Sequence, residues 1–308
     1  SARRKGRNPR RLSCLFNGRT ATDRRFELYP KHSTPLMTAT LAAAIPISEH
    51  EFSQLQQLIY HIAGITLGEH KKTLVTSRLG QRLEFHGLSS WSEYYRMVIH
   101  PQADAELQIL IDLLTTHETY FFREPAHFDF LTQTLLPQHP PGQPFDIWSA
   151  ASSTGEEIYS LCFVLADTLG IDAAWSVTGS DISNSTLAIA EKGEYRLKRT
   201  RGMPESYLRK YCLQTGDADL FAIDPKIKNH TRFRRINLNQ PLPAMERYRL
   251  IFLRNVMIYF DVPTKTRVIE RLQRQLLPGG YLVVGLAESL IGIPTSLKHV
   301  ASSIYQAP

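Results

Sequence analysis

The segment LPQHPPGQP (136–144) separates two stretches of the chain in which apolar residues follow different periods. Upstream, from Ser48 to about Leu136, apolar residues recur every three or four positions, as in amphipathic helices. Downstream, short apolar runs of strand length alternate with helical segments. We therefore predict a tail over 1–46, an all-helical domain over 47–136, a Pro-rich linker over 137–144 and an α/β domain over 145–308.

The helical stretch carries its own start and stop signals. Ser48 and Glu51 form a capping-box pattern ahead of an amphipathic segment, and Gly64 ends that segment. Ser90 and Glu93 repeat the pattern before another helix. A helix is also predicted over 69–87, with an apolar stripe formed by Val75, Leu79 and Leu83. At about 100° per residue, three basic residues of this helix lie within roughly 20° of one line, Lys71, Arg78 and Arg82.

The downstream stretch predicts a mostly parallel sheet covered by helices on both faces. The predicted strands are FDIWSA, WSVTGSD, YRLIFLRN and GGYLVVGL, and helical segments lie between them. One long insertion, at about 194–236, breaks the alternation and contains the strand-sized units LFAID, KIKN and TRFRRI. We predict that these units form a small antiparallel lobe, and that a ligand binds at the carboxyl ends of the parallel strands.

Charge and cysteine content narrow the classes of function. The 308-residue chain has a net charge of +7, but residues 1–31 hold ten Lys or Arg against two acids, which leaves the remainder at −1. The basic tail is either an arm for an anionic partner or sequence upstream of a start at Met37, so it gives no nucleic-acid signal for the folded part. Without a long apolar run or a paired-cysteine motif, we expect a cytoplasmic protein with no membrane insertion and no zinc site.

The ends of the first two predicted strands indicate the ligand. The turn SAASSTGEE has small side chains that allow a ligand close to the backbone, and its acids Glu156 and Glu157 suit a cationic ligand better than a polyphosphate. Asp181 follows the second strand, where an acid can bind both hydroxyls of a ribose or simply precede the next helix. A ribose joined to a cation suggests S-adenosylmethionine, and this order of features is that of the class I methyltransferase fold.

Four segments together resemble one family, the chemotaxis-receptor glutamate O-methyltransferases of the CheR type. They are LTTHETYFFREPAHF (114–128), IWSAASSTGEEIYSL (147–161), GSDIS with EKGEY (179–195), and INL followed by LRNVMIYFD (236–261). The resemblance runs from about Ser48 to Tyr305. It implies a class I S-adenosylmethionine-dependent methyltransferase fold, Rossmann-like with a mostly parallel sheet, with a small inserted antiparallel lobe and an all-α N-terminal domain.

The resemblance also implies roles for individual residues. Arg123 and Tyr259 would be catalytic, with Tyr259 beside the transferred methyl group. The basic stripe Lys71, Arg78 and Arg82 would face the acidic methylation helices of receptors, although spacing alone favours a solvated face. His117 stands where the family commonly has Asn, so that contact departs from the pattern. The cofactor contacts would be His117, Thr119, Arg123, Glu157, Asp181, Asn237, Leu238, Arg254 and Asn255.

The implied reaction is attack of a glutamate carboxylate on the sulfonium methyl group, giving a glutamate methyl ester and S-adenosylhomocysteine. A carboxylate is ionised at pH 7, so no general base and no metal is needed. The expected partners are chemoreceptor cytoplasmic helices, with the enzyme monomeric. In some members of the family the inserted lobe also holds a receptor C-terminal peptide, whereas the compact turn TGDADLFAID here favours an enzyme that does without it. Two alternatives stay open: a non-catalytic S-adenosylmethionine-binding sensor or scaffold, and a methyltransferase for nucleic acid or an amine.

Overall fold

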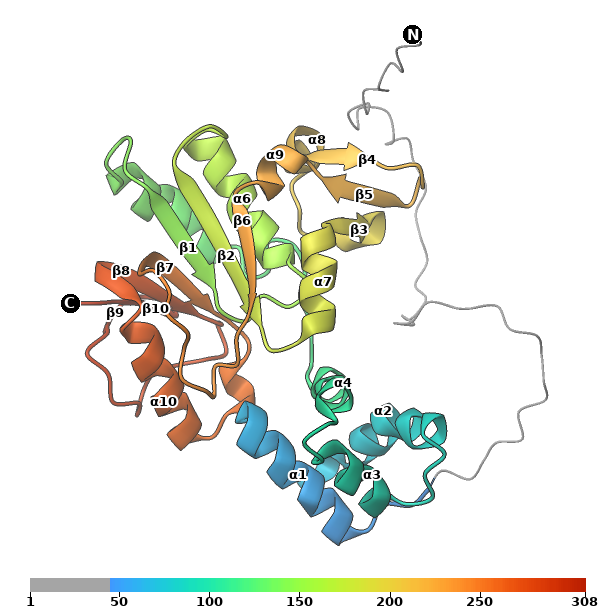
Figure 1. Ribbon diagram of the computed structural model, residues 1–308. Coiled ribbons are helices and arrows are strands. Elements are labelled where there is room, and N and C mark those ends of the chain that lie inside the picture. Colours follow the sequence, from blue (N-terminus) through green and yellow to red (C-terminus); the bar gives the residue numbers. More distant parts are fainter. Residues whose placement is uncertain (1–44) are drawn as a thin grey trace.

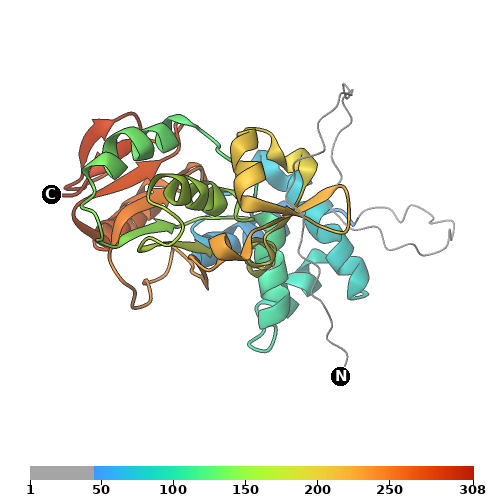
Figure 2. The ribbon, with the colours of Figure 1, turned by 90° about the horizontal axis from the view of Figure 1, so that it is seen from above.

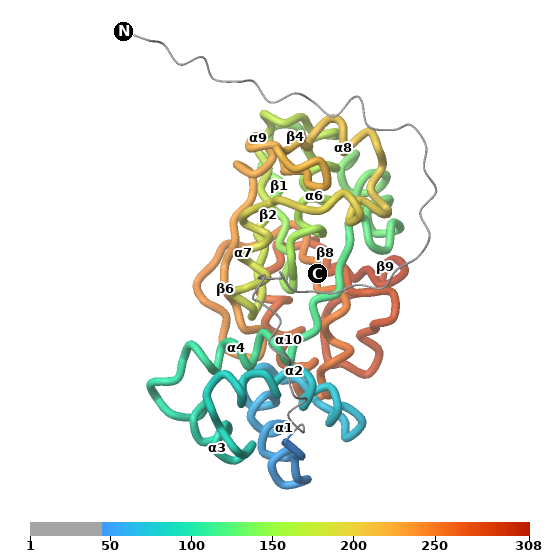
Figure 3. Tube along the Cα trace, turned by 90° about the vertical axis from the view of Figure 1, so that its right-hand side faces the viewer, coloured from blue at the N-terminus to red at the C-terminus, as the bar shows by residue number. Residues whose placement is uncertain are grey.

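The computed structural model describes residues 45–308, so nearly all of the predicted basic tail lies outside the described residues. The described chain forms a helical unit, a large sheet with its helices, and a small lobe (Figure 1). In Figure 3 the helical unit lies at one end of the molecule and the lobe at the other. Seen from above, the lobe and the helical unit project toward the same side of the molecule, and the C-terminal strands lie at the opposite, left-hand side (Figure 2).

The helical unit confirms the predicted capping signals. Ser48 and Ser90 each accept a hydrogen bond from the backbone N–H three residues later, and Glu51 and Glu93 bond back to the caps. Gly64 ends the first helix in the left-handed conformation, with φ 72°. Apolar stripes then pack the helices together around a common core. The helices are α1 (Glu49–Ala63), α2 (Lys72–Phe85, after a 3₁₀ turn η1, Glu69–Lys71), α3 (Trp91–Val98) and α4 (Asp104–Leu114).

In the described part of the chain, the main sheet has seven strands in the order β6-β2-β1-β7-β8-β10-β9. The pairs from β6 to β8 are parallel, whereas β10 pairs antiparallel with β8 and β9. The predicted mostly parallel sheet is therefore confirmed. Its strands are β1 (Phe145–Ser149), β2 (Trp175–Asp181), β6 (Thr231–Arg235), β7 (Tyr248–Leu253), β8 (Leu276–Val284), β9 (Lys298–Ala301) and β10 (Ile304–Gln306).

Helices cover both faces of this sheet and create two hydrophobic cores. Along β7 the side chains alternate: Leu250 and Phe252 face one core, and Ile251 and Leu253 face the other. The first core holds α5 (Ala126–Phe130) and α6 (Glu156–Thr168); the second holds α10 (Val262–Gln273) together with the helical unit. Helix α7 (Asn184–Lys192) follows β2 and contacts α4. The helical unit and the sheet therefore share a core.

The segment after α4 was predicted to belong to the helical domain, which was expected to end at residue 136. The chain leaves α4 without regular structure, then forms α5, a π turn η2 (Leu131–Leu135) and a 3₁₀ turn η3 (Leu136–Gln138). Phe121, Phe128 and Leu131 are buried in the core that contains α6, away from the helical unit. Helical periodicity alone could not show this, because it reports which side of a helix is apolar but not which domain covers it.

The inserted lobe is smaller than predicted. Its antiparallel sheet has the order β3-β5-β4, and α9 follows it. KIKN is not a strand: Pro225 and the Asp224 side chain, which accepts the Lys226 N–H at 2.8 Å, start a short helix there. TRFRRI is a strand, but it is β6 and pairs with β2 in the main sheet. The lobe elements are β3 (Glu194–Arg196), η4 (Leu197–Thr200), α8 (Glu205–Tyr211), β4 (Cys212–Gln214), β5 (Leu220–Ile223) and α9 (Pro225–Lys228).

Candidate active site

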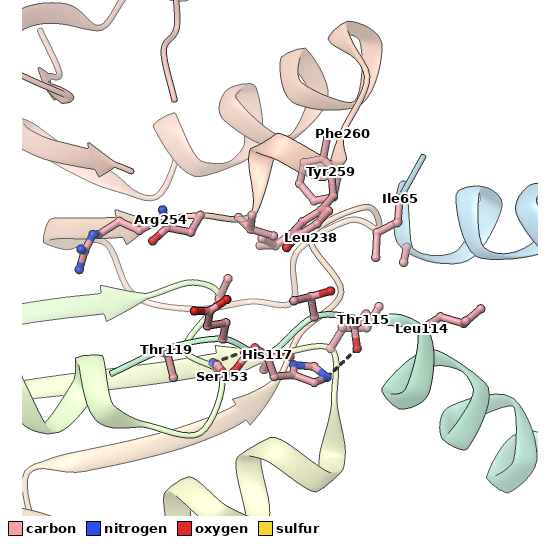
Figure 4. A pocket seen from close by; sticks show the side chains of 18 of the residues that line it. Ile65, Leu114, Thr115, His117, Thr119, Ser153, Leu238, Arg254, Tyr259 and Phe260 are labelled. Carbon is pink, nitrogen blue, oxygen red and sulfur yellow. Dashed lines mark hydrogen bonds between the residues drawn. The ribbon is translucent and has the colours of Figure 1, made fainter. Parts of the chain in front are cut away.

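A cleft lies at the carboxyl ends of β1, β2 and β7, between the sheet and the helical unit. His117, Thr119 and Ser153 lie on one side of it, and Leu238 and Tyr259 lie opposite (Figure 4). Every residue predicted to contact the cofactor lines this cleft, as do the predicted catalytic Tyr259 and the predicted docking residue Lys71. The predicted site residues that line the cleft are Lys71, His117, Thr119, Arg123, Glu157, Asp181, Asn237, Leu238, Arg254, Asn255 and Tyr259.

The turn between β1 and α6 forms the floor of the cleft. Gly155 has φ 93°, and a Cβ added there would lie 2.7 Å from the Ala190 Cβ. Ser153 also has a left-handed backbone, with φ 49°, and its N–H donates to Asp181 Oδ2 at 2.9 Å. Small side chains therefore let this turn fold tightly and bind the end of β2.

Asp181 is buried at the end of β2. Its carboxylate accepts the N–H of Ser153 and, at 3.0 Å, the N–H of Ser183. The cap of α7 is Ser183, whose hydroxyl accepts the Thr186 N–H, so Asp181 is not the cap itself. Burial raises the pKa of Asp181, and the Ser183 N–H and the nearby His117 only partly oppose this.

His117, the departure from the family pattern, contacts protein groups on two sides. Its Nε2 lies 2.7 Å from the Thr115 hydroxyl oxygen, and its carbonyl accepts the Ser153 hydroxyl at 3.1 Å (Figure 4). The imidazole thus turns toward the end of α4, while the backbone joins the β1–α6 turn.

Arg254, directly after β7, is the centre of a buried ionic network. Its side chain is 2% exposed, and Nη1 donates to Glu157 Oε2 at 2.8 Å while Nη2 donates to Glu124 Oε2 at 3.1 Å. Nη2 also donates to the carbonyl of Arg123. Glu157 accepts the Ser149 hydroxyl at 2.7 Å with its other oxygen. Arg254 thereby fixes the positions of two cleft residues, Glu157 and Arg123.

Glu124 and Glu288 belong to this network and were missed from the sequence. Glu124 accepts Asn255 Nδ2 at 3.1 Å and the Leu286 N–H at 3.1 Å. Burial would raise its pKa, but the charge of Arg254 and these hydrogen bonds lower it below the ordinary value. Glu288 accepts the Asn255 N–H at 2.8 Å, which holds Asn255 at φ 58°. Glu124 could have been found from the sequence, because it lies in the FFRE string that carries the family resemblance. No motif or spacing in the sequence indicated Glu288.

Arg123 and Tyr259, the two predicted catalytic residues, both line the cleft. Arg123 is half-buried; its Nη1 donates to the Glu118 carbonyl at 2.8 Å, and its guanidinium carbon lies 5.8 Å from the centre of the Tyr120 ring. Tyr259 ends the 3₁₀ turn η5 (Met257–Tyr259), and its carbonyl accepts the Thr66 N–H at 2.9 Å. This bond joins the helical unit to the wall of the cleft.

Asn237 joins the same two units. Its Nδ2 donates to the Ile62 carbonyl in α1 at 2.7 Å, and its Oδ1 accepts the Asn239 N–H at 3.0 Å. The carbonyl of the neighbouring Leu238 accepts Arg271 Nη1 at 2.7 Å. The end of α1 therefore positions the segment that follows β6.

The predicted basic stripe is divided by the fold. Lys71 lines the cleft, but Arg78 donates to the carbonyls of Leu113 and Thr115 at 3.0 Å each. Arg82 forms a two-pronged ion pair with Glu106 of α4. Both arginines are half-buried and hold α2 against α4. Helical spacing showed the shared direction of the three side chains but not the acid and carbonyls that lie opposite.

Two family models match the chain. "CheR methyltransferase, all-alpha domain" covers residues 50–115, and "CheR methyltransferase, SAM binding domain" covers 117–306. The chain belongs to the CheR methyltransferase family. The two CheR matches divide at the end of α4, where the packing also changes.

Named relatives agree with the CheR assignment. A "Chemotaxis protein methyltransferase" of Salmonella typhimurium is 36% identical over 277 residues, which is 87% of this chain and 92% of the relative. That of Escherichia coli is 37% identical over 275 residues, covering 87% and 93%. "Chemotaxis protein methyltransferase 2" of Pseudomonas aeruginosa is 36% identical over 262 residues, covering 84% and 93%.

Residues 45–308 contain neither a helix that could span a membrane nor a cluster of side chains that could hold a metal ion. No helix in this part of the chain combines the length and the apolar character that crossing a membrane requires. Nor do three or more His, Cys, Asp or Glu side chains of these residues converge on a point where they could hold a metal ion.

Proposed function

We propose that this protein transfers a methyl group from S-adenosylmethionine to glutamate side chains in the cytoplasmic helices of chemoreceptors. The products are glutamate methyl esters and S-adenosylhomocysteine. The observation that carries the proposal is the gathering of all the predicted cofactor residues and Tyr259 in one cleft at the strand ends. The chemotaxis relatives support the substrate class.

The side chains of the cleft fit S-adenosylmethionine chemically. Asp181 offers a buried carboxylate at the strand end where an acid can accept ribose hydroxyls. Glu157 offers a second carboxylate for a cationic group, and Ala150 and Ala151 leave room beside the backbone. Ile236 and Leu238 provide an apolar surface for a flat ring. When bound, the cofactor supplies an electrophilic methyl group on a sulfonium.

The chain's own residues act by orientation and by exclusion of water. The substrate carboxylate is already ionised at neutral pH, so no protein base has to remove a proton. Arg123 is placed to hold that carboxylate by charge-assisted hydrogen bonds, and Arg254 fixes the Arg123 backbone. Tyr259 lines the cleft opposite His117 and Thr119 (Figure 4), where its ring would exclude water from the reacting groups. Arg254 itself is committed to Glu124 and Glu157.

Lys71 is the basic residue of α1–α4 that we propose contacts the acidic receptor helix, because it lines the cleft itself. Arg78 is partly exposed, and we propose that its charge adds to the same positive face, whereas Arg82 is 19% exposed and its charge is paired with Glu106. For the lobe, the compact turn TGDADLFAID favours methylation that does not depend on a receptor C-terminal peptide, and adding the free peptide tests this.

The test is incubation with methyl-labelled S-adenosylmethionine and a panel of chemoreceptor cytoplasmic fragments. We expect label in receptor glutamates that mild base releases as methanol, as esters require. Label that resists mild base, or that enters RNA, would refute ester formation. Cofactor binding without transfer to any fragment would favour a sensor or scaffold instead.

A further inference from the structure

The inserted lobe touches the floor of the cleft through two side chains, Tyr195 and Arg199, here called the lobe clamp. Tyr195, at the centre of β3, donates its hydroxyl to the Thr154 carbonyl at 2.7 Å. Arg199, in η4, donates to the Thr154 hydroxyl at 3.3 Å. Thr154 is part of the β1–α6 turn, and the preceding residue, Ser153, lines the cleft.

The second contact of Arg199 is with a fully buried acid. Its Nη2 lies 2.8 Å from Oε1 of Glu156, whose side chain is 0% exposed, while the arginine side chain is 33% exposed. The other oxygen, Oε2, accepts the Thr154 hydroxyl at 2.6 Å. Oε1 has no well-aligned hydrogen-bond donor, so the charge of Arg199 is its main compensation. A buried carboxylate left without that charge would be strongly unfavourable.

Glu156 is the first residue of α6, directly before Glu157, which lines the cleft and pairs with Arg254. Movement of Glu156 therefore moves both the turn and Glu157. Glu156 and Glu157 were both predicted to face a cationic ligand, but of the two only Glu157 lines the cleft. Glu156 points toward the lobe, where Arg199 compensates it.

The lobe itself is docked firmly enough to transmit this contact. Tyr207 of α8 stacks on Phe122 with ring centres 5.2 Å apart, and on Phe163 of α6 at 5.9 Å. Phe121 meets Tyr195 edge to face at 5.2 Å. Aromatic contacts of this kind anchor the lobe to both the segment after α4 and α6.

We propose that Tyr195 and Arg199 are positioning residues that hold the β1–α6 turn in the shape that binds S-adenosylmethionine, so that the lobe sets cofactor affinity without touching the cofactor. This rests on the cofactor binding described above. The lobe would then influence cofactor binding in addition to any docking of a partner.

The ion pair between Arg199 and Glu156 predicts that the effect of removing Arg199 on cofactor affinity depends on pH. Burial raises the pKa of Glu156, and the charge of Arg199 and the Thr154 hydroxyl partly oppose this. The facing Tyr195 stays protonated, because burial and then the charge of Glu156 raise its pKa well above the ordinary value. Without Arg199, Glu156 is an uncompensated buried charge at high pH and becomes neutral as the pH falls. The turn is then disturbed most at high pH.

The experiment measures the dissociation constant of S-adenosylmethionine by calorimetry from pH 6 to 8.5, with full-length protein. For Arg199→Gln we expect about tenfold weaker binding at pH 8.5 and a smaller deficit at pH 6, a size typical of coupled contacts. Arg199→Lys keeps the charge and should recover most of the affinity. Arg196→Gln, on the exposed side of β3, is the matched control and should bind like wild type. The ratio of variant to wild type cancels any titration of the ligand itself.

The double variant Arg199→Gln with Glu156→Gln separates positioning from folding. It removes the buried charge, so its affinity deficit should no longer increase with pH. Equal affinity of Arg199→Gln and wild type at every pH, or a deficit that does not change with pH, would overturn the lobe clamp. Wild-type protein that binds no S-adenosylmethionine would instead overturn the proposed function.

Discussion

Replacing Arg254 by Met should destabilise the whole protein, because it removes the cation that two buried acids share. The Arg254 side chain is 2% exposed, and Glu124 and Glu157 are 14% and 13% exposed. Methionine fills much of the same space but leaves both carboxylates without their main charge partner. Removing one partner of a buried ion pair costs about 3–5 kcal/mol. At roughly 2 °C per kcal/mol for a chain of this size, the melting temperature should fall by about 6–10 °C.

The deficit should depend on pH in a defined direction. In the wild type, the folded-state pKa of Glu124 is lowered, so its stabilisation is fully present above the unfolded pKa, about 4.3, and is lost as the pH falls through the folded value. In Arg254→Met, only the hydrogen bonds from Asn255 and Leu286 still oppose burial, so the folded pKa of Glu124 rises. Ionised Glu124 then opposes folding near neutral pH, and its protonation at lower pH relieves this.

In Arg254→Met, His127 should further raise the free energy of unfolding as the pH falls. Its ring is buried, and its Nδ1 lies 3.5 Å from Glu124 Oε2. Burial and then the charge of Arg254 lower its pKa to about 4. Without Arg254 the imidazole can take up a proton at higher pH and pair with Glu124. The free energy of unfolding of the variant should thus approach that of the wild type as the pH falls from 7.5 to 5.

The assay is urea unfolding followed by circular dichroism across this pH range, with thermal melting in parallel. Arg274→Met is the matched control: Arg274 pairs with Glu270 on the surface, with side chains 70% and 58% exposed, and should cost at most about 1 kcal/mol. A loss below about 1 kcal/mol for Arg254→Met, or a deficit that grows in acid, would refute the reasoning.

Three further changes test other parts of the structure. Leu79→Ala empties a fully buried position of α2 and should lower the free energy of unfolding by about 2–5 kcal/mol in urea titration; a loss under 1 kcal/mol would mean that the helical unit is loosely packed. Gly155→Ala forces a side chain into φ 93° and 2.7 Å from the Ala190 Cβ, so we expect at least about 1–3 kcal/mol of destabilisation and weaker S-adenosylmethionine binding, measured by melting and calorimetry; unchanged affinity would argue against a rigid turn. Ser48→Ala removes the cap of α1 and should cost about 1 kcal/mol in thermal melting, whereas no change would show that Glu51 alone completes that end.

Features with local causes were predictable from the sequence. Capping boxes at Ser48 and Ser90 and the glycine at the end of α1 depend on residues within a few positions of one another. Two cofactor candidates, Glu157 and Asp181, were also predictable, because parallel strands place the residues that follow them at one edge of the sheet. Both line the cleft there, whereas Arg254 was expected only from the family resemblance.

Features set by distant partners were not predictable. TRFRRI has strand composition in either sheet, and only its pairing with β2, register Gly179 with Phe233, assigns it to the main one. Arg82 looks like a solvated or docking residue until Glu106 of α4 lies opposite it. Glu124 was adjacent to a predicted residue, yet its partners come from the segments that follow β7 and β8.

The hydrogen bond from Thr66 to Tyr259 and the bridge between Ile65 and Phe260 limit how this chain can be recombined. Because the two CheR matches meet at about residue 116, the helical part could be exchanged between relatives as if it were an independent module. A hybrid cut there would inherit one wall of the cleft from each parent. In such a hybrid the cleft would keep its shape only if Thr66 and Lys71 of the helical part match the turn η5 of the other parent.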